Sequence, residues 1–269
     1  MSDAVKSCLR CRGRGWIVAA DGGAGVAQRC DCTLERVGDE LLERAGIPRR
    51  YRHCTLEGFQ VSADTPGARD QLLRARAQCQ RYVESFLQED GSFRESGLLL
   101  MGPPGTGKTH LAVATLTELI KTYKIRGRFV DFTSLIHEIQ STFHSDSALS
   151  KDAILAPIQN AAILVLDELG AQKPSAWVQD ILYLIMNARY ASRRPTLFTT
   201  NYRLSPESPA ARQEPRSLDR GADAVSSANL LEHRVPPMLM SRLYEMAVPV
   251  LLDQAGDYRR DIRMHQHRS

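Results

Sequence analysis

Short apolar runs alternate with amphipathic stretches along most of the chain. Runs that predict strands cover residues 97–101, 129–132, 163–166, 196–200 and 247–252. Between them, apolar residues recur at helical spacing over 109–123, 135–143, 176–190 and 239–244. Strands that alternate with helices predict a central parallel sheet covered by helices on both faces, which is an α/β fold.

The segments outside this alternating region have different patterns. Residues 70–88 carry apolar positions at helical spacing, whereas 203–229 are rich in proline, serine and charge and predict a flexible insertion. The first fifty residues hold glycines and paired cysteines but no long periodic pattern. We therefore expect a small module over 1–46 with a short helix, a linker over 47–69 and the main domain over 70–269.

Composition excludes several classes of protein. The chain has 269 residues, 43% of them hydrophobic and 25% charged, with a net charge of +4. These values argue against collagen, wholesale disorder and a membrane bundle, and a mildly basic chain is compatible with nucleic acid. The longest apolar runs are too short to cross a bilayer, and Arg10, Arg12 and Arg14 interrupt any apolar leader. We expect a cytoplasmic protein with no membrane partner.

The strand over 97–101 runs into a complete phosphate-binding motif, G-x-x-x-x-G-K-[ST]. Its glycines allow a tight turn whose N–H groups face phosphate oxygens, and the helix that follows presents its positive end to the same anion. Lysine and threonine at its end are expected to contact the terminal phosphates of ATP and a Mg²⁺ ion. The motif residues are Gly102, Pro103, Pro104, Gly105, Thr106, Gly107, Lys108 and Thr109.

Polar residues follow the next two strands of the pattern. Asp167 and Glu168 come directly after 163–166, and Asn201 follows 196–200. Asp167 is expected to hold Mg²⁺ and Glu168 to act as the general base on the attacking water, since ligands sit at the carboxyl ends of such strands. The alternative interpretation is an acidic cap of the next helix. Asn201 is either a ligand of that water or a turn former.

Four of the six cysteines form two pairs near the N-terminus. Cys8 and Cys11 are spaced C-x-x-C, and Cys30 and Cys32 are spaced C-x-C. Four thiolates at such spacing can enclose one tetrahedral Zn²⁺, and a module with little core needs such a ligand to fold. Four sulfur ligands leave no open position, so we expect structural rather than catalytic zinc. Reduced free thiols and a redox pair are the alternatives.

Taken together, the motifs resemble those of the bacterial helicase-loader ATPases of the DnaC/DnaI type, members of the AAA+ superfamily. The nucleotide motifs that carry this resemblance are 102–112, 166–170 (LDELG), 199–201 (TTN) and 241–246 (SRLYEM). At the N-terminus, the four cysteines, 47–51 (IPRRY) and 55–59 (TLEGF) resemble the zinc-bearing loaders. The resemblance covers most of the chain except 203–229.

The resemblance implies a function and several residue roles. Such loaders bind a DnaB-type replicative helicase hexamer through their N-terminal region and deliver it onto single-stranded DNA under the control of ATP. Arg242 matches the arginine finger that is presented to the ATP of a neighbouring subunit, which implies self-association through the nucleotide. Asn201 matches the first polar sensor, and Arg259 matches the sensor that touches nucleotide within the same subunit.

Other interpretations remain open. An IstB-like transposition helper, which assembles on DNA and recruits a transposase, shares nearly the same core motifs. A zinc-containing adaptor that binds ATP without turnover is a third possibility, against which Asp167, Glu168 and Arg242 argue. Phe129 and Phe132 either stack on the bases of single-stranded DNA or belong to the core.

Overall fold

The computed structural model describes residues 8–19, 26–61, 65–142, 150–205, 230–258 and 260. The strands are β1 (Trp16–Ala19), β2 (Val26–Arg29), β3 (Gly97–Met101), β4 (Gly127–Asp131), β5 (Ile163–Asp167), β6 (Thr196–Thr200) and β7 (Ala247–Leu251). The α-helices are α1 (Asp31–Arg44), α2 (Pro66–Glu84), α3 (Lys108–Tyr123), α4 (Phe132–Ser141), α5 (Lys151–Asn160), α6 (Ala176–Ala191) and α7 (Pro237–Met246).

Strands β3 to β7 form one parallel sheet in the order β4-β5-β6-β3-β7. Strand β3 lies between β6 and the edge strand β7, and β6 is the central strand of the sheet. The carboxyl ends of β3, β5 and β6 therefore meet at one edge, where the phosphate motif and the acidic pair of the sequence are located.

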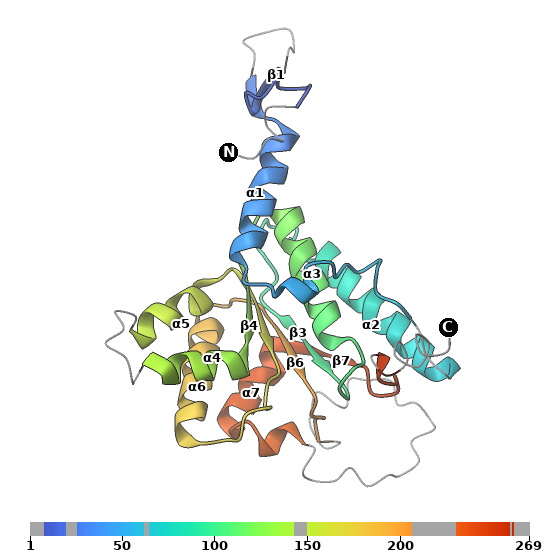
Figure 1. Cartoon of the computed structure of the whole chain (residues 1–269), viewed down its shortest axis with the longest axis vertical. Helices are drawn as coiled ribbons and strands as arrows, with labels where there is room; N and C mark the ends of the chain where they lie inside the picture. The colour runs from blue at the N-terminus through green and yellow to red at the C-terminus, as the bar shows by residue number, and fades with distance from the viewer. Residues whose placement is uncertain are drawn as a thin grey trace.

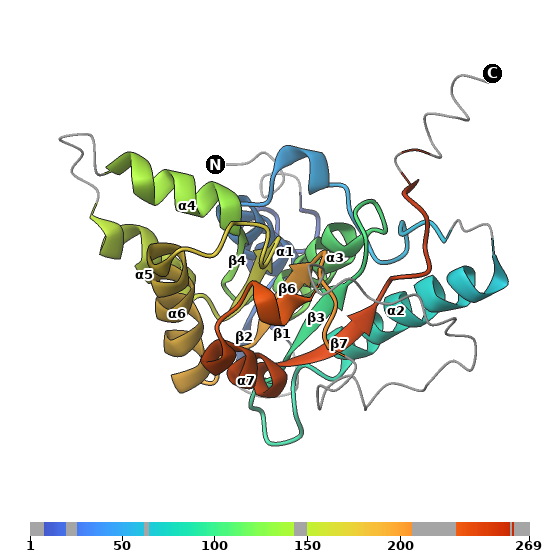
Figure 2. The same cartoon turned by 90° about the horizontal axis from the view of Figure 1, so that it is seen from below.

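Helices cover both faces of this sheet (Figures 1 and 2). Leu98 and Leu100 of β3 pack in one cluster with α2 and α3, whereas Leu99 and Met101 pack in a second cluster with α4, α5, α6 and α7. This alternation is the expected consequence of a strand period of two. The predicted parallel α/β sheet with helices on both faces is confirmed.

Local sequence explains most differences between the predicted and observed elements. Helix α2 begins at Pro66 rather than at residue 70, because the Thr65 side chain accepts a hydrogen bond from the Ala68 N–H and proline suits the first turn. Helix α5 was not predicted, since Pro157 lies inside it and obscures its pattern. Phe129 and Phe132 are buried, so the core interpretation holds for both.

The segment expected to be a linker is part of the core over residues 47–61. Ile47, Leu56 and Phe59 are buried in the cluster of α2 and α3. Just before it, the Ala45 carbonyl accepts a hydrogen bond of 2.7 Å from the N–H of Phe129 in edge strand β4. These contacts attach the end of α1 and the following segment to the sheet.

The expected insertion begins later than residue 203. Arg203 pairs with Leu230 in a short parallel bridge, and its side chain forms an ion pair of 3.4 Å with Asp253. The Ser205 N–H donates to a carboxylate oxygen of Glu232 at 2.8 Å. Residues 203–205 and 230–232 thus contact each other. The rest of the predicted insertion, 206–229, lies outside the described residues.

The N-terminal module lies at the N-terminal end of α1 and projects away from the sheet and its covering helices (Figure 1). Strands β1 and β2 form an antiparallel hairpin, and α1 follows them directly. The last turns of α1 pack on α3, where Gly38 lies close to Lys121 and Lys124.

In the part of the chain that the structure describes, no helix has the length and apolar character that crossing a membrane requires. The cytoplasmic location stays a prediction.

Candidate functional site

The phosphate motif forms a loop between the end of β3 and the start of α3. Gly107 has φ +93° and immediately precedes α3, and a Cβ there would lie 2.5 Å from the Phe59 ring. At Gly105, with φ +84°, a Cβ would lie 1.9 Å from a carboxylate oxygen of Asp257. The loop therefore needs glycine at these two positions both for backbone geometry and for space.

The lysine of the motif lies under the loop. Lys108 is buried, and its Nζ donates a hydrogen bond of 2.7 Å to the Pro103 carbonyl. The Thr106 hydroxyl donates to the same carbonyl at 3.0 Å. The ammonium group is thus held at the concave side of the loop, where it can reach phosphate oxygens.

Three side chains from separate elements meet beside the loop. Asp167, at the end of β5, is 3% exposed. Its Oδ1 accepts hydrogen bonds from the hydroxyls of Thr109, at 3.0 Å, and Thr199. Burial raises the pKa of Asp167, and these two hydrogen bonds oppose that shift. A carboxylate and a hydroxyl are the hard oxygen ligands that Mg²⁺ prefers, so Thr109 and Asp167 fit the ion expected there.

Glu168 has an unusual backbone. Its φ is +61°, a left-handed conformation that non-glycine residues seldom adopt. The strand β6 holds it there, because the Glu168 N–H donates to Thr199 Oγ1 at 3.0 Å and the Leu169 N–H donates to the Thr199 carbonyl at 2.8 Å. A backbone conformation of this kind is retained where the surrounding structure fixes it, and Glu168 is one of the residues that line the pocket described next.

A cavity of about 450 Å³ connects these residues. Glu168 and Asn201 lie on its wall together with the loop residues 104–109. Gly102 and Pro103 precede this wall in the loop, and Asp167 contacts Thr109 beside it, so the predicted nucleotide-site residues meet here apart from Arg242 and Arg259. Arg259 lies outside the described residues, although its neighbour Tyr258 lines the cavity.

Sequence reasoning missed several residues of this cavity. Thr199 was recognised only as part of a strand end, although its hydroxyl and carbonyl organise Asp167 and the turn after it. The segment 47–61 supplies part of the wall, and the IPRRY motif inside it was the available signal. The added wall residues of that segment are Arg50, Tyr51, His53, Cys54, Gly58, Phe59 and Gln60.

Arg242 lies on α7, away from the cavity of its own chain. Among the residues that the structure describes, those lining the cavity include none from α7. The guanidinium instead stacks on two tyrosine rings of α6, at 5.3 Å from the Tyr183 centroid and 5.5 Å from the Tyr190 centroid. These contacts give Arg242 a packing role against α6, and its role toward a neighbouring subunit stays a prediction.

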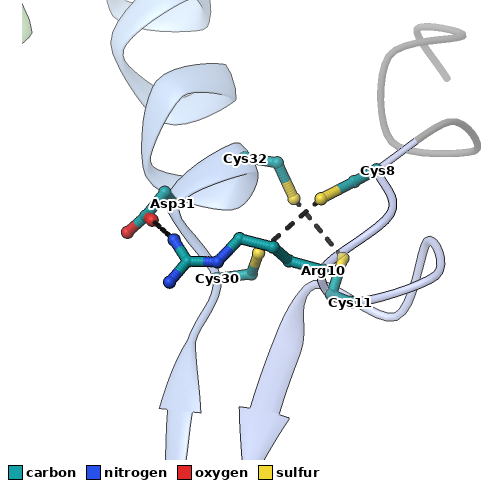
Figure 3. A network of polar contacts seen from close by, with 6 residues as sticks. All are labelled: Cys8, Arg10, Cys11, Cys30, Asp31 and Cys32. Atoms are coloured by element: carbon teal, nitrogen blue, oxygen red, sulfur yellow. Dashed lines mark hydrogen bonds and ion pairs between the residues drawn. The ribbon is translucent and has the colours of Figure 1, made fainter.

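The four N-terminal cysteines converge at the base of the hairpin (Figure 3). Their sulfur atoms all lie within 4.8 Å of one another, with 3.8 Å between Cys8 and Cys30 and 3.5 Å between Cys11 and Cys32. A tetrahedral ion with Zn–S bonds of about 2.3 Å requires sulfur atoms about 3.8 Å apart. The cluster therefore fits Zn²⁺, and the predicted site is consistent with this geometry.

Loss of one cysteine should release zinc and unfold the hairpin. We expect Cys11→Ser to lower the zinc content from one ion per chain to near zero, because three thiolates bind far more weakly and the hairpin has little core. Metal analysis would be combined with fluorescence of Trp16 on β1 in a Trp177→Phe background. Cys54→Ala is the matched control and should retain its zinc; a wild-type protein purified without zinc would contradict the prediction.

Comparison with known proteins places the chain in a family. The family of IstB-like ATP binding proteins matches residues 69–208, just over half of the 269 residues. The chain belongs to this family. The match contains the loop, Glu168 and Asn201 of the cavity wall, and Asp167, which accepts a hydrogen bond from Thr109 beside it.

Relatives of this IstB-like ATP binding protein include the replicative helicase loader DnaC of Escherichia coli K12, which is 32% identical over 163 residues. That alignment spans 60% of each chain. The phage-like element PBSX protein XkdC of Bacillus subtilis is 26% identical over 205 residues, spanning 74% of this chain and 73% of XkdC. The resemblance to DnaC-type proteins that the motifs indicated is thereby confirmed.

Solved structures agree with the family assignment. The crystal structure of the DnaC helicase loader superposes with a TM-score of 0.58 at 28% identity, covering 76% of this chain and 99% of that one. AMPPCP-bound DnaA from Aquifex aeolicus superposes with a TM-score of 0.52 at 16% identity, covering 83% of this chain and 56% of DnaA, and shows a shared fold. The predicted AAA+ fold is confirmed.

The buried carboxyl of Asp167 should make the protein without nucleotide less stable as pH rises. Because the folded-state pKa is raised above the unfolded value near 3.9, the folded protein retains a proton that the unfolded chain has already lost. The free energy of unfolding then falls from about pH 4 upward through the raised pKa.

The substitution Asp167→Asn should remove this pH dependence. It should also raise the melting temperature at pH 7, by about 2–4 °C for each kcal/mol gained. Thermal unfolding between pH 4 and 8 measures both effects, and Asp180→Asn is the surface control; a lower melting temperature for Asp167→Asn would contradict the prediction.

Proposed function

We propose that this protein is an ATPase that loads a replicative helicase onto single-stranded DNA. The proposed ATPase activity is supported by one observation: Thr109, Asp167 and Glu168 meet at the mouth of the phosphate loop. A site that only bound nucleotide would not need Glu168 held in a strained conformation beside the metal ligands. The ATP-binding family of the chain supports the same half.

Each residue has a role in this proposal. Lys108 and the loop N–H groups bind the terminal phosphates, while Thr109 and Asp167 hold Mg²⁺. When bound, Mg²⁺ supplies charge neutralisation at those phosphates. Glu168 accepts the proton of the attacking water, Asn201 orients that water, and Arg259 contacts the nucleotide. Arg242 completes the site of a neighbouring copy, in agreement with its distance from its own cavity.

The helicase-loading half has separate support. Relatives at 32% identity are named replicative helicase loaders. The zinc module projects from the ATPase body, and its Leu9 and Trp16 are 94% and 51% exposed, which offers apolar surface to a partner. We propose that this module binds a DnaB-type helicase hexamer and that the ATPase domain contacts single-stranded DNA during delivery in the cytoplasm.

The loader proposal is tested by reconstitution with the replicative helicase of the same organism. We expect a complex with the helicase hexamer, and transfer of that helicase onto single-stranded DNA circles, in the presence of ATP. A variant lacking residues 1–30 keeps α1, its packing on α3 and the Ala45 contact with β4, so it should lose the complex but retain MgATP binding. Absence of a complex with ATP, with ADP and without nucleotide would reject the loader proposal.

A transposition helper is the second candidate, which the matched family of IstB-like proteins favours. This function predicts ATP-dependent assembly on duplex DNA and capture of a transposase. The same reconstitution separates the two candidates, because a helper binds duplex DNA in the presence of ATP and ignores the helicase. A loader requires the helicase ring.

A further inference from the structure

The guanidinium of Arg242 lies against two aromatic rings of α6. Its carbon lies 5.3 Å from the Tyr183 ring centroid and 5.5 Å from that of Tyr190 (α6 and α7 in Figure 2). Its Nη1 is buried and has no hydrogen-bond partner among the residues that the structure describes. Within those residues, no carboxylate forms an ion pair with Arg242.

This arrangement preserves the charge of the arginine. Aromatic faces attract a cation and restrict its position, but they do not satisfy its N–H donors or neutralise it. A buried donor without an acceptor is unfavourable until an anion arrives. The site of Arg242 thus fixes the direction of the side chain, while the described residues supply no acceptor for its Nη1.

A neighbouring carboxylate would be expected to neutralise Arg242. Glu245 lies three residues after Arg242 on α7, a spacing at which opposite charges on a helix pair. Instead, Glu245 Oε2 accepts a hydrogen bond of 2.7 Å from the Tyr190 hydroxyl. The carboxylate of Glu245 raises the pKa of Tyr190 through this hydrogen bond and through its charge.

We propose that Tyr190 is a positioning residue for the arginine finger, and that its ring and its hydroxyl both contribute to this role. The ring holds the Arg242 guanidinium, and the hydroxyl keeps Glu245 from pairing with it. Arg242 therefore reaches the triphosphate of a neighbouring copy with its charge unpaired. The inference rests on the proposed function, in which Arg242 acts on the ATP of another subunit.

The test first removes the Tyr190 hydroxyl and then the charge of Glu245, the residue to which this hydroxyl donates. In Tyr190→Phe the ring remains but Glu245 is released, and an ion pair with Arg242 should lower kcat about two- to fivefold with KM for ATP unchanged. Adding Glu245→Gln to Tyr190→Phe should restore kcat, since the amide has no charge to pair with Arg242. Steady-state hydrolysis is measured with the full chain at a concentration where it self-associates, with MgATP, single-stranded DNA and helicase present.

A matched variant makes the same chemical change at a second tyrosine–glutamate pair, which joins α7 to the short 3-10 helix Leu231–His233 before it. The Tyr244 hydroxyl donates to Glu232 Oε1 at 3.0 Å, so Tyr244→Phe also removes a tyrosine–glutamate hydrogen bond and should leave kcat unchanged. Wild-type kcat in Tyr190→Phe would overturn the inference. So would a reduced kcat that Glu245→Gln does not restore, because that result indicates lost packing.

Arg242→Ala separates this inference from the proposed function. If Arg242→Ala loses hydrolysis while Tyr190→Phe retains it, the arginine finger stands and the role of Tyr190 is rejected. If Arg242→Ala hydrolyses ATP at the wild-type rate, the arginine finger itself is rejected, and the inference falls with it. Loss of kcat in Arg242→Ala, together with rescue of Tyr190→Phe by Glu245→Gln, supports both.

Discussion

Replacing Glu168 with glutamine should lower kcat for ATP hydrolysis by about 10²–10⁴-fold, the usual contribution of a general base. Glutamine keeps the size of the side chain and its place in the cavity but cannot take a proton from water. Binding of MgATP should persist, because Lys108, Thr109 and Asp167 remain. Phosphate release under steady-state conditions, together with the Kd of a fluorescent ATP analogue, measures the two properties separately.

The control for this substitution is Glu138→Gln, which makes the same change at an exposed position on α4 and should retain wild-type kcat. Equal rates for Glu168→Gln and the wild type, with DNA and partner present, would show that Glu168 is not the base. That outcome would favour the adaptor that binds ATP without turnover. A Glu168→Gln variant that fails to bind MgATP would instead indicate a folding defect in the turn after β5.

Removing the guanidinium of Arg242 should cost about 10³–10⁵-fold in kcat, the range known for arginine fingers. The Kd for MgATP should stay unchanged, since no residue of α7 is among the described residues that line the cavity. Arg242→Lys should recover little activity, because an ammonium cannot reproduce the planar set of donors. The rate of the wild type should also rise with protein concentration until self-association is complete.

Mixing two inactive variants tests whether the arginine acts between subunits. A Glu168→Gln subunit retains Arg242 and can complete the intact site of an Arg242→Ala neighbour, so the mixture should hydrolyse ATP although each variant alone does not. Equimolar mixing should restore up to about one quarter of the wild-type rate if sites form at random between adjacent copies. No recovery at any ratio would place the action of Arg242 within its own subunit or outside hydrolysis.

Much of the nucleotide site follows from local sequence. The loop 102–109 needs its glycines and its lysine next to one another, and the strand before it and helix after it are visible in the hydrophobic pattern. Asp167 and Glu168 directly follow an apolar strand, so the carboxyl edge of a parallel sheet was the expected place for them. The four cysteines likewise indicate their cluster through spacing alone.

The sequence by itself determined the chemical groups and the elements that carry them, because the hydrophobic period, the glycine turns and the ligand spacing are properties of neighbouring residues. Tertiary structure alone decided which distant groups meet. Thr199 reaches Asp167 across the sheet, the segment 47–61 closes the cavity, and Tyr190 lies under Arg242 while it binds Glu245. These contacts depend on strand order and helix packing, which join positions 30 or more residues apart and leave no periodic signal in the chain.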